Sequence, residues 1–119
     1  MGLDTSHDAW HGPYSSFNEF RVAIHAALGG APTTQDLSDA WEAGRYNDQS
    51  VPINVLMNHS DCDGEIAAKD CGPLADAMEA LLPKLSNAPD EYLSVRSKAK
   101  RFIVGLRDAA EANEPVDFH

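Results

Sequence analysis

Apolar residues recur every three or four positions in four stretches of the chain. This spacing places the apolar side chains on one face of a helix, which can then be buried. We therefore expect helices over about residues 16–28, 34–43, 73–82 and 90–112. The last is the longest, and its apolar face continues past Gly105.

Residues that favour helix ends bound these stretches. Ser16 begins a capping box, and Thr33 or Thr34 can cap the second helix. Pro73 suits a first helical turn, where its missing amide costs least. Asn113 should end the last helix.

Two other stretches place apolar residues at every second position, as strands do. The alternation over residues 51–57 predicts a short strand, which Pro52 confines to a sheet edge or a strand start. A helical turn initiated by Pro52 is the alternative. Val116 and Phe118 also alternate with polar residues, so a second strand there could pair with the one around Val55.

The length and composition fit one globular domain. A chain of 119 residues that is 43% hydrophobic and 24% charged can bury a core of its own. We expect a single domain over residues 1–119. Its predicted class is α+β and mostly helical, with about four helices and a very small β-sheet or hairpin.

Charge and hydropathy restrict the partners. A net charge of -10 repels nucleic acid and anionic membrane surfaces. The apolar runs are far shorter than the roughly 20 residues that cross a bilayer. Because no secretory signal is recognisable, we expect a cytoplasmic protein in which Cys62 and Cys71 are reduced thiols.

Positive charge is concentrated in the last predicted helix. Five of the nine basic residues fall within residues 96–107, at Arg96, Lys98, Lys100, Arg101 and Arg107. They form either a local anion site on an acidic protein or a solvated face that balances neighbouring acids.

A polar cluster over residues 59–65 contains possible metal ligands. His59, Asp61 and Asp63 could present one nitrogen and two oxygens to zinc or manganese. Calcium fits less well, because His59 and Asp70 stand where an EF-hand loop carries its first and last carboxylates. Alternatively, these residues cap turns and make ordinary hydrogen bonds.

The first fifteen residues form a second polar cluster, which we expect to lie across the turn at residues 59–65. His7 and His11, with Asp4, could then complete a metal shell. Histidine also exchanges a proton near neutral pH, so the same residues could serve acid–base chemistry.

Aromatic residues in this polar segment suggest a pocket for a planar ligand. Trp10 and Tyr14 could line it with Arg21 as a polar partner, or they could belong to the core. The candidate ligand-binding residues are Asp4, His7, Trp10, His11, Tyr14, Arg21, Arg96 and Lys100.

Four strings in the chain resemble those of a family of short uncharacterised proteins found in phage and bacterial genomes. They are GLDT at residues 2–5, WHGPYSSF at 10–17, NHSDCDGE at 58–65 and EPVDFH at 114–119. The resemblance implies a phage or mobile-element setting. It therefore implies a small accessory protein that sequesters a nucleotide-derived signal, binds a host defence protein or degrades a defence molecule.

The function expected from these features is the binding of a small phosphorylated or nucleotide-like molecule, with a divalent metal as an optional cofactor. One alternative is a metal-dependent hydrolase built from the histidine and aspartate clusters, in which the metal activates water. The other is an acidic protein–protein interaction module without a pocket, whose partner is a host protein.

Overall fold

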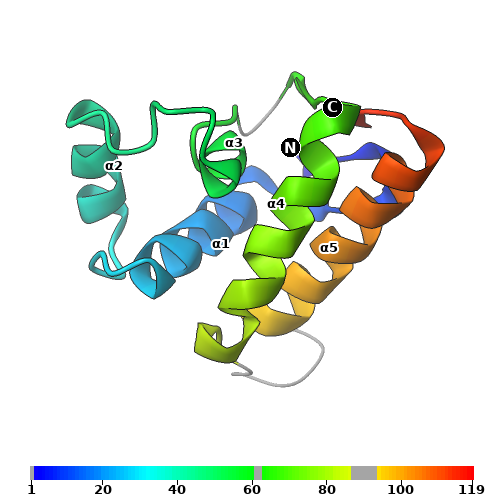
Figure 1. Cartoon of the computed structure of the whole chain (residues 1–119). Coiled ribbons are helices and arrows are strands. Elements are labelled where there is room, and N and C mark those ends of the chain that lie inside the picture. Colours follow the sequence, from blue (N-terminus) through cyan, green and yellow to red (C-terminus); the bar gives the residue numbers. More distant parts are fainter. Residues whose placement is uncertain (1, 61–62, 87–93) are drawn as a thin grey trace.

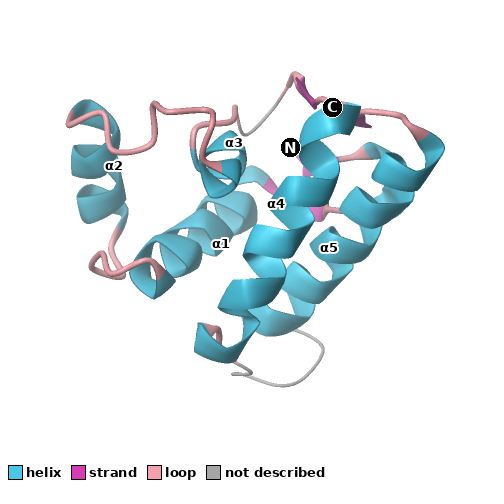
Figure 2. Ribbon diagram, viewed as in Figure 1, coloured by secondary structure: helices cyan, strands magenta, loops and turns pink. Residues whose placement is uncertain are grey.

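The protein is mostly helical, with two very small antiparallel sheets (Figures 1 and 2). The computed structural model describes residues 2–60, 63–86 and 94–119. Within them lie the helices α1 (Tyr14–Ala27), α2 (Thr34–Glu42), α3 (Pro52–Met57), α4 (Ala68–Leu81) and α5 (Val95–Ala112), the 3-10 turns η1 (Ser6–Asp8) and η2 (Leu82–Lys84), and the strands β1 (Gly2–Asp4), β2 (His11–Pro13), β3 (Glu65–Ile66) and β4 (Val116–Asp117). The predicted α+β, mostly helical class is confirmed.

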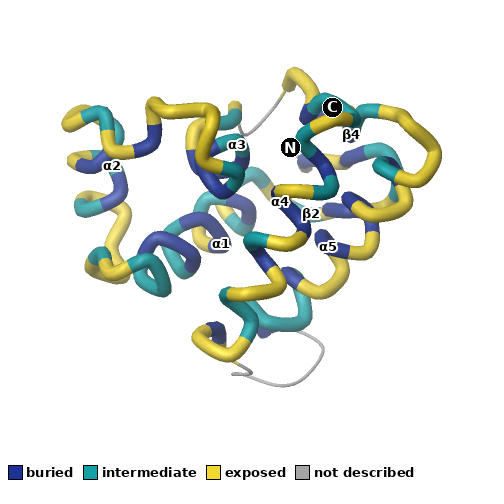
Figure 3. Tube along the Cα trace, in the orientation of Figure 1, coloured by how far each residue is buried: buried dark blue, intermediate teal, exposed yellow. Residues whose placement is uncertain are grey.

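Helices α1, α4 and α5 enclose the core, and α2 lies farther out beyond α1 (Figure 1). Figure 3 shows buried positions along the facing sides of these three helices. Phe102 of α5 is fully buried, with its ring centroid 6.5 Å from that of Phe17 and 6.1 Å from that of Phe20. The predicted apolar face of the last helix is therefore confirmed.

The strands connect segments that are far apart in the sequence. Leu3 of β1 pairs with Gly12 of β2, whereas Asp4 turns its amide and carbonyl to the other side and exchanges two 2.9 Å hydrogen bonds with His119. A bridge between Thr5 and Phe118 continues this contact. Since β4 also pairs with β3, the C-terminal strand lies between β1 and β3.

The strand predicted over residues 51–57 is wrong, because this segment forms helix α3. Pro52 occupies its first turn, as the alternative interpretation required. Ile53, Leu56 and Met57 are buried, which is the i, i+3, i+4 spacing of a helix face. The C-terminal strand is present, but its partner is β3 rather than the segment around Val55.

Several predicted helix ends also differ. Helix α1 begins at Tyr14 with Pro13 as its N-cap, so the capping box expected at Ser16 lies within the first turn. Helix α4 begins at Ala68 and contains Pro73. Thr33 caps α2 as predicted, since its side chain accepts a hydrogen bond from the Asp36 amide.

Two boundaries concern the last helix and its neighbours. Asn113 ends α5 in a left-handed conformation, as predicted. Residues 90–93 of the predicted helix lie outside the described residues.

Among the described residues, none of the helices combines the length and the apolar character that a membrane span requires.

Candidate functional site

The loop at residues 6–10 adopts an unusual backbone and is held from several sides. His7 and Asp8 have φ angles of 58° and 55°, a left-handed conformation that costs energy for residues other than glycine. Thr5 fixes the end of the loop, because its hydroxyl accepts from the Trp10 amide at 2.9 Å and its own amide donates to the Trp10 carbonyl at 3.0 Å.

Helix α5 and the C-terminal segment hold the outer side of this loop. Arg101 donates to the Asp8 carbonyl at 3.0 Å and to its carboxylate at 2.5 Å. His7 lies 3.3 Å from the Glu114 carboxylate. The Ser6 hydroxyl accepts from the Asp117 amide at 2.9 Å. These contacts fix the position of Trp10 at the end of the loop.

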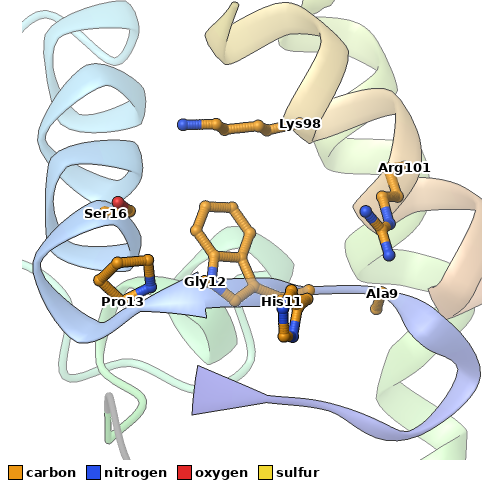
Figure 4. Close-up of a pocket in the computed structure, with 8 residues that line it drawn as sticks. Ala9, His11, Gly12, Pro13, Ser16, Lys98 and Arg101 are labelled. Atoms are coloured by element: carbon orange, nitrogen blue, oxygen red, sulfur yellow. The ribbon is translucent and has the colours of Figure 1, made fainter. Parts of the chain in front are cut away.

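A cavity of about 170 Å³ opens beside Trp10 (Figure 4). It lies between β2, the start of α1 and the face of α5. Its lining residues are Ala9, Trp10, His11, Gly12, Pro13, Ser16, Lys98 and Arg101. Figure 4 shows Lys98 extending from α5 toward the side where Ser16 lies, whereas the His11 ring is on the other side of β2. We call this hollow the Trp10 cavity.

Two cations of α5 line the Trp10 cavity. The Lys98 ammonium lies 5.9 Å from the centre of the Trp10 ring and forms no ion pair with any described residue. Arg101 donates hydrogen bonds to Asp8 through Nε and Nη2. The N–H groups of Nη1 can therefore donate to another group. The Arg101–Asp8 pair is largely exposed, so water and salt screen it.

The N-terminus of α1 adds partial positive charge on the opposite side. The first amides of a helix have no partner within the helix, and the helix dipole makes this end favourable for anions. Pro13 provides no side-chain cap for them, and the first turn of α1 contains no acidic residue. Ser16, in the same turn, brings its hydroxyl to the cavity wall.

Trp10 contributes a buried hydrogen-bond donor. The residue is only 4% exposed, and its ring packs against Phe17 and Phe20 at centroid distances of 5.3 and 5.1 Å. Its Nε1–H has no hydrogen-bond acceptor among the described residues. An unsatisfied buried donor costs about 1–3 kcal/mol, so this group favours an external acceptor.

Gly12 leaves space next to this donor. A side-chain carbon at Gly12 would lie 3.8 Å from Trp10 Nε1 and within 4 Å of no other described atom, apart from those of its chain neighbours. The absence of a side chain at Gly12 therefore preserves open space beside the indole nitrogen.

The structure places only some of the predicted ligand-binding residues at the Trp10 cavity. Trp10 and His11 line it, and the Asp4 carboxylate contacts the His11 ring. His7 is directed to Glu114 instead. Tyr14, the first residue of α1, is half-buried against the core.

The predicted cations of α5 are not those that line the cavity. Arg96 donates to the Leu85 and Pro83 carbonyls, and Lys100 is exposed away from the lining. Lys98 and Arg101 line it instead. Each precedes a buried residue of α5, Ala99 or Phe102, and so flanks the buried face of the helix. The sequence alone does not say which flank faces β2.

Arg21 lines a second, more open hollow of about 380 Å³ with Trp41, Asn58 and His59 among its neighbours. Its guanidinium lies between two aromatic rings, 5.0 Å from the Phe17 centroid and 5.2 Å from that of Trp41. It also donates to the His59 carbonyl. These contacts give Arg21 a structural role between α1, α2 and the segment after α3.

The predicted metal ligands do not form a described cluster. Among the described residues no group of three His, Cys, Asp or Glu side chains is placed to hold an ion, and Asp61 lies outside them. Both ring nitrogens of His59 face carbonyls, Ser60 at 2.8 Å and Glu65 at 3.0 Å. A neutral imidazole donates through one of its two ring nitrogens, and that nitrogen offers no lone pair to a metal.

The C-terminal segment lies between the two polar clusters. His59 stacks on Phe118 with a centroid distance of 4.1 Å, and the Phe118 amide donates to the Gly64 carbonyl. On its other side Phe118 forms the bridge to Thr5. The N-terminal loop was predicted to lie across the turn at residues 59–65, and β4 instead separates the two.

Cys71 is a buried free thiol of α4. Burial raises the pKa of the Cys71 thiol, which keeps it protonated and unreactive. Cys62 lies outside the described residues.

Comparison of the chain with protein-family models, with curated proteins and with solved structures gives no match. The functional argument therefore rests on the geometry and charge of the Trp10 cavity.

Proposed function

We propose that the protein binds a small phosphorylated molecule and that the phosphate group occupies the Trp10 cavity. The observation that carries this proposal is the convergence of Lys98 and Arg101 from α5 on the uncapped N-terminus of α1. Ammonium, guanidinium and helix amides are the groups with which proteins hold phosphate.

The charge of the whole chain favours a small ligand. A net charge of -10 repels a long polyanion such as nucleic acid over its whole length. A small anion experiences mainly the local cations of the cavity. Strand β2 and α5, which form the walls, are fixed relative to each other by the loop contacts of Asp8 and Ala9.

The size of the cavity limits what can enter. At about 170 Å³ it is smaller than the roughly 300–1,000 Å³ of pockets that bury a drug-sized ligand. It therefore accommodates a phosphate group with a short substituent, or the phosphorylated end of a larger molecule whose remainder stays in solvent.

Titration calorimetry with inorganic phosphate at low ionic strength tests the proposal. We expect Lys98→Met to weaken phosphate binding roughly 10- to 100-fold, because a hydrogen bond to a charged group contributes about 1.5–3 kcal/mol. Methionine keeps much of the apolar stem that covers Trp10.

Lys100→Met is the matched control. It removes the same charge from the same helix at an exposed position outside the cavity lining. Phosphate affinity close to wild type in Lys100→Met supports a local site. An equal loss in both variants, or a wild-type protein that binds no phosphate, contradicts the proposal.

A further inference from the structure

The geometry points to a second determinant in the same cavity, and this inference rests on the proposed function. We propose that the indole N–H of Trp10 is a specificity-determining donor, which selects a tetrahedral phosphate over a planar carboxylate. In the bound state, one phosphate oxygen accepts from Trp10 Nε1 and another from the Lys98 ammonium.

The donor already has the required surroundings. Trp10 Nε1 is buried and has no acceptor among the residues that the structure describes. A side-chain carbon built on Gly12 would lie 3.8 Å from it, so glycine keeps this position free of side-chain atoms. Rings of Phe17 and Phe20 fix the orientation of the indole, so the N–H direction is set before a ligand arrives.

Lys98 and Trp10 line the same cavity. The Lys98 ammonium lies 5.9 Å from the centre of the Trp10 ring. Because the lysine side chain is long and flexible, an anion in the cavity can accept one charge-assisted hydrogen bond from Lys98 and another from the indole N–H.

Lys98 is the lining side chain that can adjust to an anion. In the structure its side chain lies over the indole, an arrangement that a cation–π attraction stabilises. Its long side chain can follow an anion into the cavity and uncover the edge of the ring, because it has no ion-pair partner among the described residues to leave. The backbone does not need to change.

The arrangement of donors selects the shape of the anion. Lys98 and Arg101 approach from α5, the helix amides and Ser16 from α1, and the indole N–H from the loop before β2. A phosphate directs its oxygens toward several donors that do not share a plane, whereas the two oxygens of a carboxylate lie in one plane.

Nuclear magnetic resonance of the indole N–H groups, with methyl phosphate as the probe, tests the inference. The chain has two tryptophans, and Trp41→Phe assigns their signals. The Nε1–H of Trp41 already donates to the Met57 carbonyl at 2.8 Å. We expect methyl phosphate to move the Trp10 signal downfield and to leave that of Trp41 in place.

Two further measurements complete the test. Trp10→Phe keeps an aromatic ring against Phe17 and Phe20 but removes the donor, so methyl phosphate affinity should fall about tenfold. Acetate at the same concentration should leave the Trp10 signal nearly unchanged. The shift of the Trp10 signal is measured in the wild-type protein, so it remains informative even if Trp10→Phe folds poorly.

The outcomes separate this inference from the proposed function. If phosphate binding depends on Lys98 but the Trp10 signal does not move, Trp10 is not a ligand contact, and the proposed function stands. If acetate moves the signal as far as methyl phosphate does, selection of a tetrahedral anion is wrong. If the wild-type protein binds neither inorganic phosphate nor methyl phosphate, both proposals fail.

Discussion

His25 is a fully buried histidine that joins α1, α2 and the segment after α2. Its Nε2 lies 2.6 Å from the Asp36 carboxylate and its Nδ1 lies 2.6 Å from the Tyr46 hydroxyl. A side chain at Gly30 would meet the ring 2.2 Å from Nε2, so only glycine fits there without rearrangement. The trio resembles a catalytic relay, but burial of His25 and Tyr46 assigns it to structure.

This network predicts how stability depends on pH. The hydrogen bond from His25, followed by that from the Ala31 amide, holds the pKa of Asp36 below its ordinary value of 3.8. A carboxyl with a depressed folded-state pKa stabilises the fold fully above its unfolded pKa, and this contribution is lost as pH falls through the folded value. We therefore expect the free energy of unfolding to decrease below about pH 4.

Urea denaturation between pH 2 and 6, roughly the range of carboxyl titration, measures this effect. Asp36→Asn should reduce the slope of stability against pH. Asp39→Asn, which removes a carboxylate of α2 that does not contact His25, is the control. An unchanged slope in Asp36→Asn contradicts the assignment.

At the scale of elements, helix periodicity predicted α1, α2, α4 and α5 because each buries one continuous face. The strand predicted over residues 51–57 is wrong, because a segment this short fits both the alternation of a strand and the i, i+3, i+4 spacing of a helix. The start of α4 was missed for another reason. Pro73 removes one backbone hydrogen bond and its ring crowds the preceding turn, and the burial of Cys71 and Leu74 outweighs that cost.

The candidate site was only partly predictable. Trp10 and His11 stood out as aromatic and polar residues in a loop without helical period. The choice between Lys98, Lys100 and the other cations depends on which side of α5 faces β2. That side is set by tertiary packing of Ala9 against Gly105, which no local pattern encodes.

The contact between η1 and α5 gives a prediction for Gly105. A side-chain carbon there would lie 2.5 Å from Ala9 Cβ and 2.7 Å from Ala9 Cα, closer than packed atoms allow. We expect Gly105→Ala to destabilise the protein by about 1–3 kcal/mol despite the better helix propensity of alanine. The strained loop must shift, so phosphate affinity should fall as well.

Val104→Ala provides the comparison in thermal unfolding. It also places alanine in the middle of α5, but Val104 is 59% exposed. A change within about 0.5 kcal/mol is expected for such a surface position. If Gly105→Ala unfolds at the wild-type temperature or above it, the close approach of η1 and α5 is wrong.

At the scale of the whole molecule, the C-terminal segment is the link between the two polar clusters. On one side it hydrogen-bonds to Asp4, with Phe118 opposite Thr5, and on the other it hydrogen-bonds to Gly64 and pairs with β3. These partners are far apart in the sequence, so the local pattern predicts the strand near Val116 but not its neighbours. Pairing in a sheet depends on the path of the chain rather than on local spacing.

Phe118 carries the last prediction, because it packs where these segments meet the core. The residue is 4% exposed, and its ring centroid lies 5.6 Å from that of Phe17 and 4.1 Å from that of His59. Removing a buried aromatic side chain costs about 3–5 kcal/mol, so Phe118→Ala should lower the free energy of unfolding in urea by that amount. Val51→Ala, at a residue 42% exposed, should have little effect.

Hydrogen exchange tests the same contact locally. The amides of Asp4 and His119 should lose protection in Phe118→Ala, because their mutual hydrogen bonds form only while the C-terminal segment is packed against the core. A loss below about 1 kcal/mol, with both amides still protected, would show that the C-terminal strand does not hold the two clusters together.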